Sequence, residues 1–268
     1  KGAPWVDLDR IELDCQRLAA KQDPGQAERY FGNRIVAGAD KAFDIELYKK
    51  LAAPTVVIAR GRKVPLGFDG SLSQDATGLV ATDIESGHQV VVGYWFRPPH
   101  LTEDADWNVP IAELNDAIAF AFDFWDVWRL YADPPHYTDD LNRWAGLYGQ
   151  DRVIEWWTNR IKQMAYALKA WRTDMRAGVM SHGPLDDSAE SVEAHAALIR
   201  HVGNAVRRPT KIRDDEDGKF MFFIGKDGQK SPRKIDLAMA ACLSWECRGD
   251  AIAAGVLNKP TYGRAAWR

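Results

Sequence analysis

The chain has 268 residues, of which 46% are hydrophobic and 27% are charged. This composition supports one large domain, or one domain with an appendage, and excludes a disordered chain. Three cysteines without CxxC spacing argue against a disulfide scaffold or a zinc site and favour a reducing compartment. No apolar run approaches the roughly 18 residues of a membrane span, so we expect no membrane partner.

The basic residues are distributed unevenly along a chain whose formal net charge is −3. Residues 200–234 contain ten Lys or Arg against five Asp or Glu, so this stretch carries +5 and the remainder −8. Such asymmetry is typical of a nucleic-acid footprint. A solvated helix face with loops would give the same pattern, and the charge alone does not separate the two.

Residues 1–57 are predicted to be helical. Apolar residues recur every three or four positions in "PWVDLDRIELDCQRLAA", and Pro54 ends a second short helix in "AFDIELYKKLAAPT". Strands are predicted next, in "TVVIARG", in "VPLGFDG" and in a hairpin over "ATGLVATDIESGHQVVVGYWFRP".

Helices and strands alternate in the following part. "VPIAELNDAIAFAFDFWD" and "TDDLNRWAGLYG" are typical of helices, whereas "VWRLYADPPHY" and "RVIEWWT" are typical of strands. Two amphipathic helices, a hairpin with Asp217 and Gly218 at its tip, and an Ala-rich helix that begins near Pro232 complete the chain. This order predicts a mixed α/β sheet with helices on its faces.

Three acids occupy comparable positions. Asp69 and Asp133 each lie at the end of a predicted strand, and Asp236 lies in the first turn of the last helix. Each alone has an ordinary explanation as a turn or helix-start residue. Together they suit a pair of Mg²⁺ or Mn²⁺ ions, which need carboxylate oxygens from several elements. Without a cation, three clustered acids would repel one another.

Four motifs carry a family resemblance. "GFDGSLSQDATGLVA", "YADPPHY", "HVGNA" and "RKIDLAMA" resemble the C-terminal nuclease domain of the large terminase subunit of tailed bacteriophages, in particular phages of actinobacteria. The resemblance covers about residues 66–245. It implies a ribonuclease H-like fold and metal-dependent cutting of concatemeric double-stranded DNA during genome packaging. Residues 58–268 would form the nuclease domain, and residues 1–57 the helical linker that follows an ATPase domain.

The resemblance also implies roles for individual residues. Asp69, Asp133 and Asp236 would be the catalytic acids and would hold two divalent cations, Mg²⁺ or Mn²⁺, with Asp69 bridging them. Asp75 would be a further ligand or a group that hydrogen-bonds to a ligand. The auxiliary residues His201 and Asn204 lie three positions apart on one helix face, without an assigned role. Basic residues expected to contact DNA phosphates are Lys234, Arg233, Arg207, Arg208 and Lys211.

The expected partners follow from the family. No GxxxxGK[ST] phosphate loop occurs, so we expect no ATP hydrolysis or translocation by this chain alone. Because the sequence also begins at Lys1 without methionine, we expect it to be part of a longer protein whose ATPase domain precedes it. The family implies double-stranded DNA, the portal protein and the small terminase subunit as partners, in the cytoplasm of the infected bacterial host at the procapsid portal.

Two other interpretations compete with a nuclease. "GFDGSLSQDATGLVATD" also resembles the first phosphate-binding turn of actin-like ATPases and sugar kinases. That interpretation requires a second Gly-rich turn, but "YADPPHY" has prolines where backbone amides would be needed. The chain could instead be a non-catalytic packaging module that binds DNA or the portal, although the presence of all three acids argues against lost cleavage.

Overall fold

The computed structural model describes residues 7–20, 41–71, 75–98, 100–101, 107–228 and 231–258. The chain forms two compact units, Lys1–Ala42 and Phe43–Arg268. The first contains α1 (Leu8–Ala20), which confirms the first predicted helix. None of the helices in the described part of the chain combines the length and apolarity that crossing a membrane requires.

A six-stranded sheet in the order β5-β4-β1-β2-β3-β6 organises the second unit. Its strands are β1 (Lys63–Asp69), β2 (Thr77–Thr82), β3 (His88–Trp95), β4 (Asp126–Ala132), β5 (Val153–Glu155) and β6 (Ser181–Gly183). The first three strands form an antiparallel meander, β4 and β5 continue parallel to β1, and β6 pairs parallel with β3. This is the ribonuclease H-like mixed sheet that the sequence predicts.

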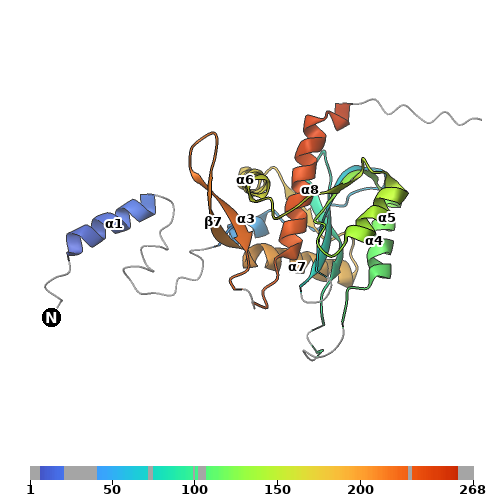
Figure 1. Ribbon diagram of the computed structural model, residues 1–268, viewed down its shortest axis with the longest axis horizontal. Coiled ribbons are helices and arrows are strands. Elements are labelled where there is room, and N and C mark those ends of the chain that lie inside the picture. The colour runs from blue at the N-terminus through green and yellow to red at the C-terminus, as the bar shows by residue number, and fades with distance from the viewer. Residues whose placement is uncertain are drawn as a thin grey trace, which may run out of the picture. The chain divides into compact units, whose positions relative to one another are not determined.

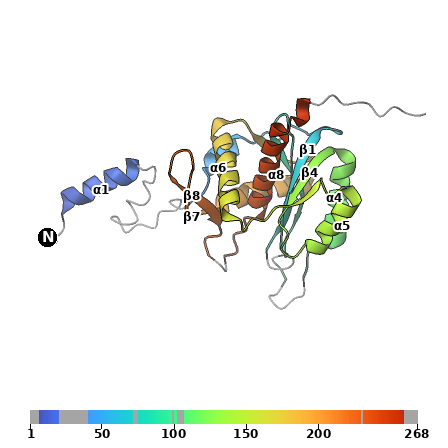
Figure 2. The same cartoon turned by 45° about the horizontal axis from the view of Figure 1, so that its top comes forward.

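Helices cover both faces of the sheet. One face carries α4 (Ile111–Phe124) and α5 (Thr138–Tyr148), and the other carries α8 (Asp236–Ala253), so that β1 and β4 lie between them (Figure 2). On the α8 side (Figure 1), α6 (Ile161–Ala177) and α7 (Ala189–Asn204) pack against α8, and α3 (Ile45–Lys50) packs against α6 and α7. A short 3-10 helix, η1 (Val256–Asn258), follows α8.

The two faces of β1 explain this layering. Val64, Leu66 and Phe68 alternate along the strand and are fully buried in the core under α4 and α5. Gly67 points to the other face, where a Cβ atom would lie within 3.0 Å of backbone atoms of Ala240 and Ser244. Because Gly67 has no side chain, α8 lies directly on the backbone of β1.

A separate two-stranded ribbon confirms the predicted late hairpin. It consists of β7 (Val206–Arg213) and β8 (Phe220–Gly225), paired antiparallel. The acids at its tip pair with lysines of α6. Lys162 contacts Asp215 at 3.3 Å, and Lys169 contacts both Asp214 and Glu216 at 2.6 Å. The tip is therefore attached to α6 through its acids, which leaves the basic residues of β7 farther along the ribbon.

Three local predictions need correction. Residues 55–61 ("TVVIARG") form no strand: Val56 donates to the Ala53 carbonyl in a turn, and Val57 is exposed. Among the described strands none pairs with this β-branched run, which connects α3 to β1 instead. The sequence analysis missed β6, whose three residues have no apolar pattern of their own. The last helix begins at Asp236 rather than near Pro232.

The contact at Gly67 can be tested by adding a single methyl group. Gly67→Ala should lower the free energy of unfolding by about 3 kcal/mol or more, because the new Cβ meets helix backbone that cannot move aside cheaply. Gly146→Ala is the matched control, since nothing lies within 4 Å of a Cβ at that exposed position of α5. It should be neutral or stabilise by about 0.5–1 kcal/mol. Urea unfolding measures both, and equal effects would contradict the close packing of α8 on β1.

Candidate active site

Two of the three predicted acids meet because β1 and β4 are parallel. The register pairs Phe68 with Ala132, so Asp69 and Asp133 stand next to each other at the same edge of the sheet. The Asp133 amide donates to the Phe68 carbonyl at 3.1 Å, which continues the ladder to the acids. Because Phe68 and Ala132 both face the core under α4 and α5, the residues that follow them face α8.

The third acid comes from the start of α8. Gly78 of β2 is the register partner of Asp69, and the side chain of Leu237 fills the space that a Cβ on Gly78 would need. Leu237 follows Asp236, the first residue of α8, so this packing holds the start of the helix above the strand ends. Asp236 is 7% exposed.

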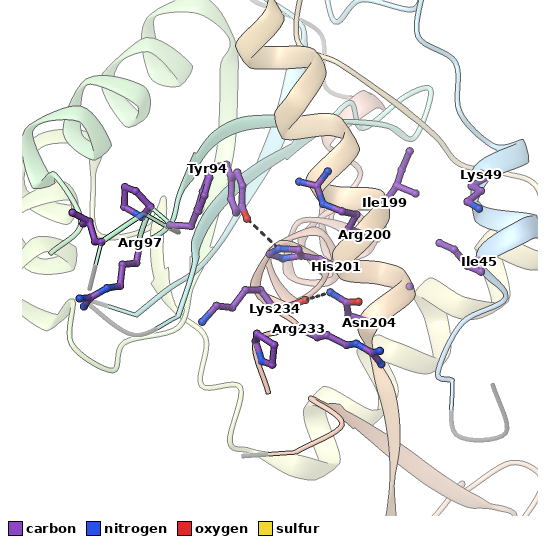
Figure 3. Close-up of a pocket in the computed structure, with 15 residues that line it drawn as sticks. Ile45, Lys49, Tyr94, Arg97, Ile199, Arg200, His201, Asn204, Arg233 and Lys234 are labelled. Carbon is purple, nitrogen blue, oxygen red and sulfur yellow. Dashed lines mark hydrogen bonds between the residues drawn. The ribbon is translucent and has the colours of Figure 1, made fainter. Parts of the chain in front are cut away.

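Two residues of the "HVGNA" motif, His201 and Asn204, form hydrogen bonds to the backbone at the start of α8. His201 Nδ1 accepts the amide proton of Leu237 at 3.1 Å, and the Asn204 side chain donates to the Lys234 carbonyl at 2.9 Å (Figure 3). Burial lowers the pKa of His201 to about 3, so the ring is neutral and Nε2 carries its proton. Nε2 donates this proton to the Tyr94 hydroxyl oxygen, which lies 3.3 Å from Nε2. His201 and Asn204 thus position the backbone on both sides of Asp236.

The acids influence one another electrostatically. Burial, followed by the charges of Asp236, Asp133 and Asp75, raises the pKa of Asp69 well above its usual range. Part of the Asp69 residue remains at the surface, but protein atoms surround its carboxylate closely. Burial, together with the charge of Asp75, raises the pKa of Asp236 to about 6. Four acids therefore share a region in which full ionisation is unfavourable.

Asp133 is held by Thr158, in the segment between β5 and α6. One carboxylate oxygen accepts from the Thr158 amide at 3.0 Å and the other from its hydroxyl at 2.8 Å. Burial raises the pKa of Asp133, although both hydrogen bonds oppose that shift. Sequence reasoning missed Thr158, because a threonine after "RVIEWW" gives no signal that it will face an acid of another strand.

Asp75 has a different environment. Lys226 and Lys234 both donate to its Oδ1 atom, Lys234 at 2.8 Å. Burial alone would raise the pKa of Asp75, but the two lysines outweigh it and lower the pKa. The Lys226 ammonium group also favours ionisation of Asp69, and both ammonium groups favour ionisation of Asp236, so they act as cations built into the acid cluster. Sequence reasoning did not single out Lys226, which was one basic residue among ten in residues 200–234.

The side chains do not form a closed metal-binding cage. Among the residues that the structure describes, no three His, Cys, Asp or Glu side chains lie close enough to hold an ion as they stand. The chemistry of the cluster nevertheless fits a hard divalent cation. It provides carboxylate oxygens that repel one another, and the buried Oδ2 atom of Asp236 has no hydrogen-bond partner among the described atoms.

The predicted phosphate contacts fall in two places. Arg233 and Lys234 lie immediately before α8, and the Arg233 side chain pairs with Asp227 at 2.9 Å. The other predicted contacts, Arg207, Arg208 and Lys211, lie on β7. Arg208 and Lys211 are exposed, whereas Arg207 is half-buried and lies 5.3 Å from the centre of the Phe222 ring. The sequence cluster is thus divided between the helix entrance and the ribbon.

Comparison with known proteins supports the fold. The HK97 bacteriophage large terminase aligns with a TM-score of 0.55 and 18% identity over 85% of this chain and 50% of that one. The chain therefore shares the fold of the matched half of that terminase. It is also 28% identical to the Gene 13 protein of Mycobacterium phage D29 and 25% identical to that of Mycobacterium phage L5. Both matches cover 92% of this chain, which spans only 41% of each relative. No protein-family model matches the sequence.

The repulsion among these acids predicts an effect on stability. In EDTA near pH 8, Asp236→Asn should raise the free energy of unfolding by about 1–3 kcal/mol, because it removes a buried charge. Because the pKa of Asp236 is raised in the folded state, that state binds more protons than the unfolded state at pH values between the ordinary pKa of an aspartate and about 6. The destabilisation that Asp236 causes therefore grows as pH rises through that range. Urea unfolding should therefore show a smaller gain near pH 5.

An exposed acid provides the control for this prediction. Asp116→Asn changes a carboxylate on the outer surface of α4 and should have little effect at either pH. A gain for Asp236→Asn that is the same near pH 5 and near pH 8 would contradict the role of charge at Asp236.

Proposed function

We propose that this chain is the nuclease part of a phage large terminase, a divalent-metal-dependent endonuclease that cuts concatemeric double-stranded viral DNA during genome packaging. The observation that carries the proposal is that Asp69, Asp133 and Asp236 approach one end of the sheet from two parallel strands and one packed helix, near enough for the charges of Asp236 and Asp133 to raise the pKa of Asp69. A structural scaffold gains nothing from three such acids in one place, whereas phosphodiester hydrolysis needs them to hold cations. The terminase-like fold supports the same conclusion.

The three acids would hold two Mg²⁺ or Mn²⁺ ions, with Asp75 as an additional ligand or a hydrogen-bonding neighbour. Such ions, when bound, activate the attacking water and stabilise the leaving 3′ oxygen. The chain itself contributes orientation. Thr158 fixes both oxygens of Asp133, and His201 and Asn204 fix the backbone that carries Asp236. Lys226 and Lys234 keep Asp75 ionised next to the cluster.

The basic residues would bind the DNA backbone. Arg233 and Lys234 adjoin the acids, and Arg207, Arg208 and Lys211 extend the positive surface along β7. Contacts to phosphates position a duplex but do not read its sequence, so we expect weak sequence preference. Binding should weaken as the salt concentration rises, because each phosphate contact releases counterions.

The biological setting is proposed from the family resemblance. The chain would act with the ATPase domain of the same full-length protein, the small terminase subunit and the portal protein. Its place would be the cytoplasm of the infected bacterial host, at the procapsid portal. The fraction of the Gene 13 proteins that it matches leaves room for such an ATPase domain in those relatives.

Removal of single carboxylates tests the proposal. Asp69→Asn, Asp133→Asn and Asp236→Asn should each reduce plasmid cutting in Mg²⁺ or Mn²⁺ by more than about 100-fold, because each removes a ligand charge without changing side-chain size. Asp116→Asn, the exposed control on α4, should cut at the wild-type rate. Agarose-gel assays of supercoiled plasmid, with and without EDTA, measure the rates.

The same assay separates the competing interpretations. Wild-type rates in all three aspartate variants would refute the metal site. A wild-type chain that binds duplex DNA without cutting it in either metal would favour the non-catalytic packaging module. Metal-dependent ATP hydrolysis by this chain would favour the actin-like or sugar-kinase interpretation instead.

A further inference from the structure

A groove of about 1010 Å³ lies beside the end of α7 (Figure 3). Its lining comes from α3, the end of β3 and the residues after it, the end of α7, and the segment before α8. The volume is at the upper end of the roughly 300–1,000 Å³ typical of small-molecule pockets. The groove therefore accommodates a ligand of several linked units, and the proposed cutting reaction does not require it.

The groove is strongly positive. None of its described lining residues is acidic. Five of them are cationic: Lys49, Arg97, Arg200, Arg233 and Lys234. The Arg200 side chain is 54% exposed and pairs at 2.7 Å with Glu193, whose side chain is 63% exposed. Arg233 is 59% exposed and pairs with Asp227. Such surface pairs are weak and screened by salt, so a phosphate can replace the carboxylate.

The groove also contains an aromatic platform. The rings of Tyr94 and Phe96 stack with centres 4.9 Å apart at an angle of 24°. The hydrogen bond from His201 holds the Tyr94 hydroxyl in place, while 42% of Phe96 is exposed to solvent. An exposed ring in a groove lined by cations is the combination that proteins use for single-stranded nucleic acid. A duplex leaves few base faces free to stack on such a ring, and an inorganic anion needs no ring.

The groove is continuous with the acid cluster. Lys234 lines the groove, and its ammonium group donates to Asp75 at 2.8 Å. His201 lines it as well and accepts the amide proton of Leu237, next to Asp236. The groove and the acid cluster therefore share Lys234 and His201 as neighbours.

We propose that this groove binds single-stranded DNA, with a base stacked on Phe96 and phosphates held by Arg200 and Arg233. The ligand would be the unpaired strand at a cut or frayed DNA end next to the acids. This binding function goes beyond the proposed cutting of duplex DNA and does not depend on a metal ion, so it can be tested separately.

The test uses the whole chain and a fluorescently labelled oligothymidylate in EDTA, with binding followed by anisotropy. Phe96→Ala should weaken binding about tenfold through the lost stacking, and Phe96→Trp should restore it. Arg200→Gln should reduce the slope of log affinity against log salt by about 0.7, the value for one phosphate contact on a single strand. Plasmid cutting in Mg²⁺ is measured in parallel.

The matched control is a second exposed, stacked phenyl ring on α4. Phe120 is 40% exposed and stacks on Phe124 at 5.2 Å and 21°, far in the fold from the acids, on the opposite face of the sheet. Phe120→Ala should leave oligothymidylate affinity unchanged. Phe96→Leu replaces Phe96→Ala if the latter fails to fold, as judged by its thermal unfolding midpoint, and should show the same loss.

The possible outcomes are distinct. Equal affinities for wild type, Phe96→Ala and Phe120→Ala would overturn the proposal, as would a wild-type chain that binds only a duplex or only a free nucleotide. A chain that cuts plasmid but binds no oligothymidylate overturns the groove assignment and leaves the nuclease proposal intact. A chain that binds oligothymidylate through Phe96 in EDTA but cuts nothing supports the groove and refutes the nuclease.

Discussion

The contact between α8 and the backbone of β1 and β2 is the constraint on which the site depends. Gly67 and Gly78 lack the side chains that would separate the helix from the strands. The helix can therefore pack so closely that Leu237 lies over Gly78, the register partner of Asp69. This packing also places the preceding residue, Asp236, near Asp69. Because the same contact closes the core and places the acid, packing and chemistry cannot change independently in this part of the molecule.

The charges of the site work against the fold rather than for it. Burial and mutual repulsion disfavour ionised Asp69 and Asp236, and among the described residues no lysine forms a hydrogen bond with either acid. Lys226 and Lys234 offset part of this repulsion through Asp75. The rest of the structure tolerates the arrangement because neutral, well-satisfied contacts surround it, such as those of Thr158 and His201. Functional sites commonly depart from the most stable solution in this way.

Most strands and helices could be predicted from the sequence, because their patterns are local. The acids were found for the same reason: Asp69 and Asp133 end apolar runs, and Asp236 begins one. The strand predictions that were wrong or missing concern segments whose structure depends on partners far away in the sequence. Residues 55–61 have the composition of a strand but no neighbour, whereas β6 has a neighbour but no strand-like composition. The roles of His201 and Asn204 were equally hidden, since each bonds to backbone of another element.

The topology of the site has a consequence for when activity can arise. The acids come from the first strand of the sheet, from a middle strand and from the last long helix that the structure describes. Their meeting therefore requires contacts between segments far apart in the chain, which form slowly and late in folding. During synthesis, a partly made chain lacks the helix that completes the cluster. The cluster is therefore complete only in molecules whose final helix has docked.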